Sequence, residues 1–227
     1  MKPYFQDKWV TIYHGDCREI LPQLDVKVDL VLTDPPYGIC EEDGKVQMRG
    51  EVVEPDYKEW DTFDKDWIHL LPLKADSSIV VFHDQKQATI LWQTFIECGI
   101  RPSRYLFWDK GDSGINPRHN FVNTIEMALF GNRGNYTWNC NGSTINLFRK
   151  NRIPTPLHPT QKPEILFQSL IGWLSNSKNL ILDPFLGSGT TCYCAKKLSR
   201  YSIGIEIEEK YCEAAARRCC QEVMELV

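Results

Sequence analysis

The 227-residue sequence lacks a long hydrophobic run. No apolar stretch approaches the roughly 20 residues that a membrane-spanning helix requires. The first residues, Met1 to Asp7, also lack the apolar core of a signal peptide. We therefore expect a cytoplasmic protein with no membrane segment.

The spacing of its cysteines is poor for a disulfide framework or a metal site. There are nine cysteines, an odd number. Cys192 and Cys194 lie two apart in an expected helix, and Cys219-Cys220 has no matching Cys-x-x-Cys partner. We expect reduced, mostly buried thiols and no metal.

The sequence also lacks an overall basic charge, since its formal net charge is −4. The charges are unevenly placed, however: residues 101–162 carry +6 and the remainder carries −10. A basic segment can be a solvated face, but this polarisation also suits a surface that binds phosphates. The basic residues that we predict to contact DNA are Arg118, Arg133, Arg149, Lys150 and Arg152.

Apolar runs alternate with amphipathic segments along most of the chain. We predict strands over residues 9–14, 28–32, 78–82, 105–108, 124–130, 179–182 and 201–205, and helices over 18–24, 60–73, 85–98, 163–174, 190–198 and 209–226. This order predicts one α/β domain over residues 1–227, with a mostly parallel sheet, an antiparallel pair at 105–108 and 124–130, and helices on both faces. Polar residues 39–59 predict a mobile loop, and 131–157 predict an irregular surface insertion.

The segment Thr33-Asp34-Pro35-Pro36-Tyr37-Gly38 follows a strand that we expect to be buried on both faces. Two prolines stiffen the turn and fix the directions of its carbonyls. Asp34 and the Pro35 carbonyl can accept hydrogens from an exocyclic amine, while Tyr37 can stack on the ring that carries it. In isolation the segment could be an ordinary proline-rich turn.

A second loop, Gly187-Ser188-Gly189, lies between an expected strand and an expected helix. Its glycines allow a ligand to approach the backbone, and Glu206, at the end of the next strand, is placed for a ribose diol. Simple tight packing is the alternative reading. A dinucleotide-binding loop would have a third glycine where this chain has Cys192, so a mononucleoside ligand without a pyrophosphate fits better.

Three segments, Thr33–Gly38, His158-Pro159-Thr160-Gln161-Lys162-Pro163 and Asp183–Thr190, together resemble the S-adenosylmethionine-dependent amino-methyltransferases of DNA. Their order, with the Asp-Pro-Pro-Tyr motif before the cofactor motif, resembles the β group of that family. The resemblance implies a circularly permuted, Rossmann-like methyltransferase fold, in which the first strand lies beside the last. It also implies DNA methylation of the kind found in restriction-modification systems.

The resemblance assigns a role to each matching position. Catalysis would use Asp34, Pro35, Pro36 and Tyr37. The cofactor would contact Asp16 and Cys17 at its adenine, Glu206 at its ribose, Thr160, Gln161 and Lys162 at its carboxylate, and Asp34, Asp183, Phe185, Gly187, Ser188, Gly189 and Thr190 around its amino-acid end. Trp108, Lys110 and Glu126 also match family patterns, without an assigned role.

The target base would flip out of the duplex and receive the methyl group directly, with no covalent enzyme intermediate. Asp at the first position of the Asp-Pro-Pro-Tyr motif favours adenine N6 in the family resembled. Cytosine N4, an RNA base, a protein glutamine amide and a catalytically silent DNA-binding subunit remain as alternatives. The insertion before His158 is short for the family, and this leads us to expect a homodimer.

Overall fold

The structure, a computed structural model, describes residues 1–38, 46–48, 51–53, 63–111, 124–149 and 162–220. Within them the strands are β1 (Phe5–Gln6), β2 (Val10–His14), β3 (Val28–Thr33), β4 (Val46–Met48), β5 (Glu51–Val53), β6 (Leu73–His83), β7 (Arg101–Asp109), β8 (Ile125–Asn132), β9 (Leu147–Arg149), β10 (Leu180–Asp183) and β11 (Tyr201–Glu206). The α-helices are α1 (Cys17–Ile20), α2 (Ala88–Glu97), α3 (Glu164–Leu174), α4 (Thr190–Lys197) and α5 (Glu209–Cys219). Short 3-10 helices are η1 (Leu21–Gln23), η2 (Asp66–Leu70) and η3 (Gln85–Gln87).

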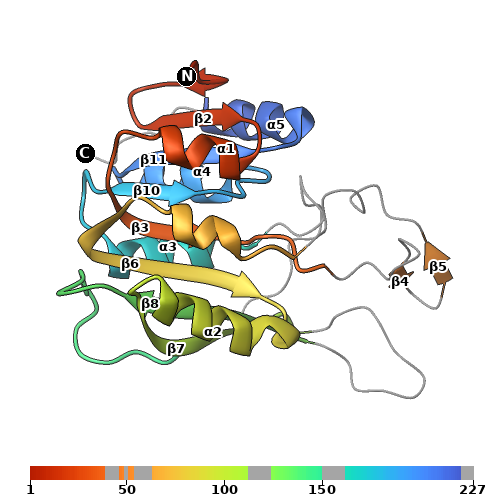
Figure 1. The fold of residues 1–227 in the computed structure, drawn as a ribbon, viewed down its shortest axis with the longest axis vertical. Coiled ribbons are helices and arrows are strands. Elements are labelled where there is room, and N and C mark those ends of the chain that lie inside the picture. Colours follow the sequence, from red (N-terminus) through yellow and green to blue (C-terminus); the bar gives the residue numbers. More distant parts are fainter. Residues whose placement is uncertain (39–45, 49–50, 54–62, 112–123, 150–161, 221–227) are drawn as a thin grey trace.

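One sheet, with strand order β1-β2-β11-β10-β3-β6-β8-β7-β9, organises the chain (Figure 1). The five strands from β2 to β6 in this order are parallel, and β8 is antiparallel to both β6 and β7. The carboxyl ends of β2, β11, β10, β3, β6 and β7 therefore meet at one edge, called the carboxyl edge below. Ligands of open parallel sheets bind outside such an edge.

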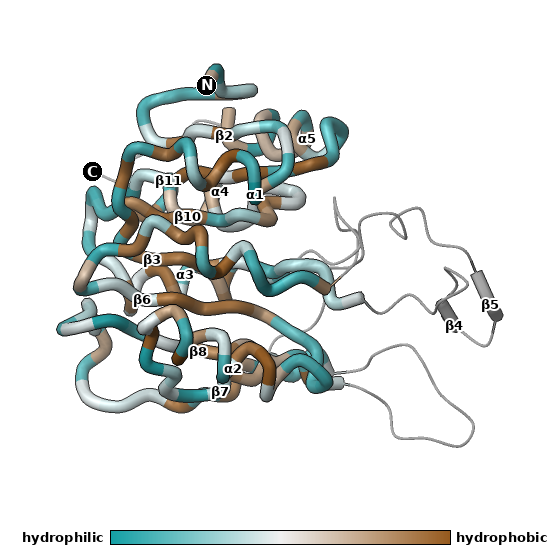
Figure 2. Tube along the Cα trace, viewed as in Figure 1, coloured by the Kyte–Doolittle hydropathy of each residue, from teal (hydrophilic) through white to brown (hydrophobic). Residues whose placement is uncertain are grey.

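The predicted fold class and the permuted strand order are both observed. β2 pairs in parallel with β11, with Glu206 opposite His14, so the first long strand lies beside the last. The predicted antiparallel pair is β7 and β8. Hydrophobic residues concentrate in the central strands (Figure 2), because those strands are covered on both faces.

Helices cover the two faces of the sheet with separate apolar clusters. On one face, α1, η1, η2 and α2 contribute Ile20, Leu21, Trp67 and Phe95 to a core with β3 and β6. On the other face, α3, α4 and α5 pack against β3, β10 and β2. Cys192, Cys194, Cys212 and Cys219 are buried there as free thiols, as predicted from their spacing.

The predicted helix over residues 60–73 is wrong where the structure describes it. Residues 66–70 form the 3-10 helix η2, and β6 begins at Leu73. Pro72 is the physical reason, because it disfavours a helical backbone at Leu71, whose φ and ψ are −65° and 126°. Residues 60–62 lie outside the described part.

Two predicted irregular segments are only partly described. Within 39–59, β4 and β5 form a small antiparallel sheet that the sequence did not predict, and the predicted mobility of the remaining residues falls outside the described part. Within 131–157, residues 131–132 end β8, β9 pairs with β7, and 150–157 lie outside. No helix among the described residues is long and apolar enough to span a bilayer.

Candidate active site

Asp34 lies at the carboxyl edge, directly after β3, which is paired with β10 on one side and β6 on the other. Its Oδ1 accepts a hydrogen bond of 2.5 Å from the Tyr37 hydroxyl, and its Oδ2 accepts one from Lys162 Nζ. Pro35, the second residue of this turn, is buried. The four residues predicted to act in catalysis therefore form one turn whose carboxylate is held by a neighbouring phenol and an ammonium.

A residue that sequence reasoning missed also holds this turn. Gln87 Nε2 donates to the Tyr37 carbonyl oxygen over 2.6 Å. Gln87 is itself fixed by a capping box, because its Oε1 accepts from Asp84 N. The Asp84-x-x-Gln87 spacing is a recognisable helix-start pattern, and could have identified this anchor after β6.

The resemblance assigns Lys162 to the cofactor carboxylate, and the structure places its ammonium beside the acceptor turn. Its ammonium is only 3% exposed and lies between Asp34 and Glu126, with Nζ 3.0 Å from Glu126 Oε2. Glu126 in turn accepts from Lys110 Nζ over 3.2 Å. The structure thus gives Lys110 and Glu126 a place beside Asp34. Thr160 and Gln161, predicted at the cofactor carboxylate, lie outside the described residues.

Burial and these neighbours set the pKa values at the site. Burial raises the pKa of Asp34, and Lys162 opposes that rise. Burial also acts to raise the pKa of Glu126, but Lys162 and Lys110 outweigh it and lower the pKa. The pKa of Tyr37 is raised well above its usual value by burial and by Asp34, so the phenol stays a donor.

Asp183, at the end of β10, joins the catalytic strand to the glycine loop. Its Oδ1 accepts from Thr33 Oγ1 over 2.6 Å and from Phe185 N over 3.1 Å, and its Oδ2 accepts from Thr191 Oγ1. Burial raises the pKa of Asp183 to about 6. Asp183 was predicted to contact the cofactor, and in the structure its carboxylate is hydrogen-bonded to β3, its own loop and α4.

The glycine loop has the backbone that its sequence predicts. Gly187 and Gly189 have φ of 54° and 81°, values that residues with a Cβ rarely adopt. Glu206 lies against this loop, because its Oε2 accepts from Gly187 N over 2.7 Å. Ser188 and Thr190 are buried beneath it, where the Ser188 carbonyl and the Thr190 hydroxyl accept from Arg218 of α5.

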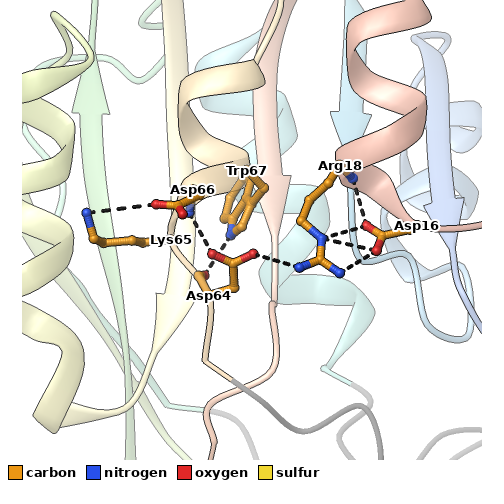
Figure 3. A network of polar contacts seen from close by, with 6 residues as sticks. All are labelled: Asp16, Arg18, Asp64, Lys65, Asp66 and Trp67. Carbon is orange, nitrogen blue, oxygen red and sulfur yellow. Dashed lines mark hydrogen bonds and ion pairs between the residues drawn. The ribbon is translucent and has the colours of Figure 1, made fainter.

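The predicted adenine and ribose contacts lie side by side. Gly15 N donates to the Glu206 carbonyl oxygen over 2.9 Å, which brings Asp16 next to the end of β11. The Asp16 carboxylate caps α1 and pairs with Arg18, which also reaches Asp64 (Figure 3). Cys17 is buried at the start of α1.

An aromatic contact lies next to Asp64. Trp67 donates through Nε1 to the Asp64 carbonyl oxygen over 3.1 Å (Figure 3). Its ring meets the edge of Phe185, with centroids 5.1 Å apart. Phe185 was predicted to line the cofactor, and Trp67 is its partner from η2, which sequence spacing alone did not reveal.

The basic residues predicted to bind DNA are not all on one edge. Arg149 ends β9 opposite Asp109, so it lies at the carboxyl edge, with 78% of its side chain exposed. Arg133 follows β8 at the opposite edge, where its backbone N donates to the Ser77 carbonyl and its guanidinium to that of Cys98. Arg133 is therefore separated from Asp34. Arg118, Lys150 and Arg152 lie outside the described residues.

The site thus combines two neighbouring features at the carboxyl edge of a mostly parallel sheet. One is an acceptor turn with an aromatic ring, and the other is a glycine loop beside a buried carboxylate. Glu206 has its pKa raised to about 7 by burial, and its oxygens can accept from hydroxyl groups. This arrangement defines an α/β transferase-type site for a nucleoside-containing ligand and an amine.

Comparison with known proteins identifies the family. Residues 28–217 match the DNA methylase model for N6 and N4 methyltransferases. The chain therefore belongs to this family of DNA amino-methyltransferases, which confirms the family predicted from the three motifs.

Individual relatives are similar over nearly the whole chain. The type II methyltransferase M2.LlaDCHI of Lactococcus lactis subsp. cremoris is 28% identical over 96% of this chain and 91% of its own length. The M1.HpyAVI structure, solved as a complex with S-adenosylmethionine, is 27% identical with a TM-score of 0.74, covering 92% of this chain and 99% of its own. The cytosine-N4-specific PvuII methyltransferase has a TM-score of 0.76 at 19% identity, over 99% and 91% of the two chains, and this likeness concerns the fold.

Proposed function

We propose that the protein transfers a methyl group from S-adenosylmethionine to the N6 amino group of adenine in DNA. The observation that carries the proposal is the Asp34–Tyr37 turn, held at the carboxyl edge beside the glycine loop by the Thr33–Asp183 hydrogen bond of 2.6 Å. This bond joins the acceptor turn to the start of the cofactor motif. Family membership supports amino-methylation of DNA, and the M1.HpyAVI complex supports S-adenosylmethionine as the cofactor.

The residues present fit this cofactor. Gly187 and Gly189 give the loop its left-handed backbone, and Glu206 offers carboxylate oxygens beside it. Asp16 follows the adjoining strand β2, next to the end of β11, where it would contact the base of the same nucleoside. S-adenosylmethionine supplies the electrophilic methyl group when bound. Phe185, packed on the buried ring of Trp67, adds an apolar side chain to the same loop.

The turn supplies the chemistry on the substrate. The lone pair of an aromatic amine is delocalised into its ring, which makes the nitrogen a poor nucleophile. Asp34 and the Pro35 carbonyl would accept the two amine hydrogens and favour a pyramidal nitrogen with its lone pair available. Tyr37 would stack on the flipped base, whose extrusion from the duplex costs about a few kcal/mol.

Adenine is preferred to cytosine on two grounds. The family resembled pairs Asp at the first motif position mostly with adenine, and a purine offers Tyr37 a larger face. N4 of cytosine is the second candidate, because both bases carry an amino group next to a ring nitrogen. The fold is shared with the cytosine-N4-specific PvuII enzyme, so fold alone does not separate them.

Mass spectrometry of nucleosides from duplex DNA incubated with the protein and S-adenosylmethionine tests the proposal. We expect N6-methyladenine with the wild-type protein and none with Asp34→Ala, which removes the amine acceptor. RNA and protein substrates run in parallel should stay unmethylated. N4-methylcytosine alone would overturn the choice of base, and undiminished product from Asp34→Ala would overturn the assignment of Asp34.

A further inference from the structure

Lys162 is the most enclosed cation beside the acceptor turn. Its side chain is 3% exposed, against 16% for Asp34 and 20% for Glu126. It precedes α3, whereas Asp34 follows β3 and Glu126 lies on β8, so the ion pairs join three separate elements. The ammonium also lies over the faces of Phe82 and Tyr37, with Nζ 5.2 Å and 5.7 Å from the ring centroids.

Counted over the described residues, the charges in this cluster balance. Two carboxylates, Asp34 and Glu126, face two ammonium groups, Lys162 and Lys110. A buried ion pair is weak evidence for stability, but removing one member leaves an uncompensated buried charge. Lys162 is shared by both carboxylates, so its loss would leave Asp34 facing Glu126 without a cation between them.

We propose that Lys162, anchored by Glu126, is a positioning residue that holds Asp34 as an oriented, ionised acceptor for the target amine. This inference rests on the proposed function, and it gives Lys162 a different role from the contact with the cofactor carboxylate that the family resemblance implies. The geometry supports this role, because Asp34 at the end of β3 and Glu126 on β8 both contact the Lys162 ammonium.

The groups around Asp34 determine what removal of Lys162 should do. Among the described residues, Lys162 is the cation in contact with Asp34, and Glu126 on β8 raises the pKa of Asp34. The charge of Asp34 in turn raises the pKa of Asp183 on β10. The Tyr37 hydroxyl donates to Asp34 from the same turn, and Asp84 lies near that phenol. Without Lys162, burial and Glu126 act together to raise the pKa of Asp34, and a protonated Asp34 loses acceptor capacity.

The pH profile of methyl transfer by the full-length protein, on duplex DNA with S-adenosylmethionine, tests the proposal. For Lys162→Gln we expect kcat to fall at least about tenfold, and the acid limb of kcat/KM to move up by about one pH unit or more. The Kd for S-adenosylmethionine, measured by calorimetry, should change less than about twofold, because Lys162 in this role does not contact the cofactor. Lys162→Arg places a cation beside Asp34 again, so its acid limb should lie between those of Lys162→Gln and the wild type.

Two further variants make the result specific. Glu126→Gln removes a neighbouring acid while its amide oxygen can still accept from Lys162, so its acid limb should move down, opposite in sign to Lys162→Gln. Lys197→Gln is the matched control, because it removes a lysine from a surface pair with Glu164, and it should match the wild type. A Kd for S-adenosylmethionine weakened tenfold or more with an unmoved acid limb would show that Lys162 is a cofactor ligand and overturn the proposal.

A direct titration separates this inference from the proposed function. The pKa of Asp34, followed by carboxyl carbon NMR against an Asp34→Asn reference, should be higher in Lys162→Gln than in the wild type. This readout needs no methylation. A wild-type protein that methylates no DNA would refute the proposed function alone, whereas an unchanged pKa of Asp34 in folded Lys162→Gln, or in Lys162→Met if the first variant fails to fold, would refute the role of Lys162.

Discussion

At the scale of single residues, the chain positions its site through buried carboxylates that the sequence identified but whose contacts it did not reveal. Asp34, Asp183 and Glu206 were all found from motifs in their local context. The pairing of Asp34 with Lys162 joins positions 128 residues apart, and that of Asp183 with Thr33 joins positions 150 apart. Sequence spacing is informative about neighbours along one element, so contacts across the fold required the structure.

Asp183 gives a pH prediction for stability. Its pKa is raised to about 6 by burial from an ordinary value of 3.8, so the folded state binds its proton more tightly than the unfolded chain. The stability from this group is therefore complete below about pH 4 and is lost as pH rises through about 6, a change on the order of 3 kcal/mol.

Asp183→Asn should remove this dependence with little change of shape. Its amide can accept from Thr33 and Phe185, while Thr191 can turn its hydroxyl toward the Leu32 carbonyl, 3.4 Å away. We expect the melting temperature of Asp183→Asn, relative to the wild type, to increase between pH 4 and pH 7. A constant difference across that range would show that Asp183 does not titrate there.

At the scale of elements, most strands and helices followed from the sequence. The central strands are apolar runs because both faces are buried. Their alternation with helices predicted the parallel sheet, and the family resemblance implied the β2–β11 pairing. The helix predicted at 60–73 was wrong, because the helical spacing of its aromatic residues does not overcome the break that Pro72 imposes. The β4–β5 pair and the edge strand β9 were missed because three-residue strands in polar segments carry almost no periodic signal.

The packing of α4 against α5 depends on Gly189. A Cβ built there would lie 2.8 Å from the Cβ and 2.9 Å from the Cα of Ala215 on α5, and φ is 81°. Gly189→Ala must therefore displace α5 or the loop. Gly142 is a matched control, since its φ is 78° and nothing lies within 4 Å of its Cβ position.

We expect Gly189→Ala to lower the free energy of unfolding by about 1 to 3 kcal/mol more than Gly142→Ala does. Both substitutions bear the cost of a left-handed backbone, so the difference isolates the steric clash. Urea titration with a tryptophan or circular dichroism signal measures it. Equal losses in the two variants would mean that α5 shifts at no cost.

At the scale of the whole molecule, exposed Arg149 and the acceptor turn lie at the same edge of the sheet. Arg149 lies at the carboxyl edge, and its Nε is 3.8 Å from Asp109, a loose pair that leaves the guanidinium exposed. Lys27 precedes β3 at the opposite edge and is also exposed. A duplex that delivers a base to Asp34 must approach the edge that carries Arg149.

Neutralising these two residues should therefore have different effects on DNA binding. Arg149→Gln should weaken duplex affinity and reduce the slope of log K against log salt by about one, as expected for one lost phosphate contact. Lys27→Gln should leave both unchanged. Fluorescence anisotropy at several salt concentrations provides the measurement, and equal slopes for Arg149→Gln and wild type would remove Arg149 from the DNA surface.

The size of the predicted recognition insertion, residues 131–157, bears on the oligomeric state. Between β8 and α3, the described residues form only one short strand, β9, at the edge of the sheet. Specific protein–DNA interfaces usually bury about 1,000 Å² or more of protein surface, and one subunit with so short an insertion offers little area to grip and read a duplex. Two copies would double that area, so we expect a homodimer.

Light scattering should give twice the subunit mass of 26.3 kDa with and without duplex DNA. A mass of one subunit in both states would mean that a single copy binds and reads its site.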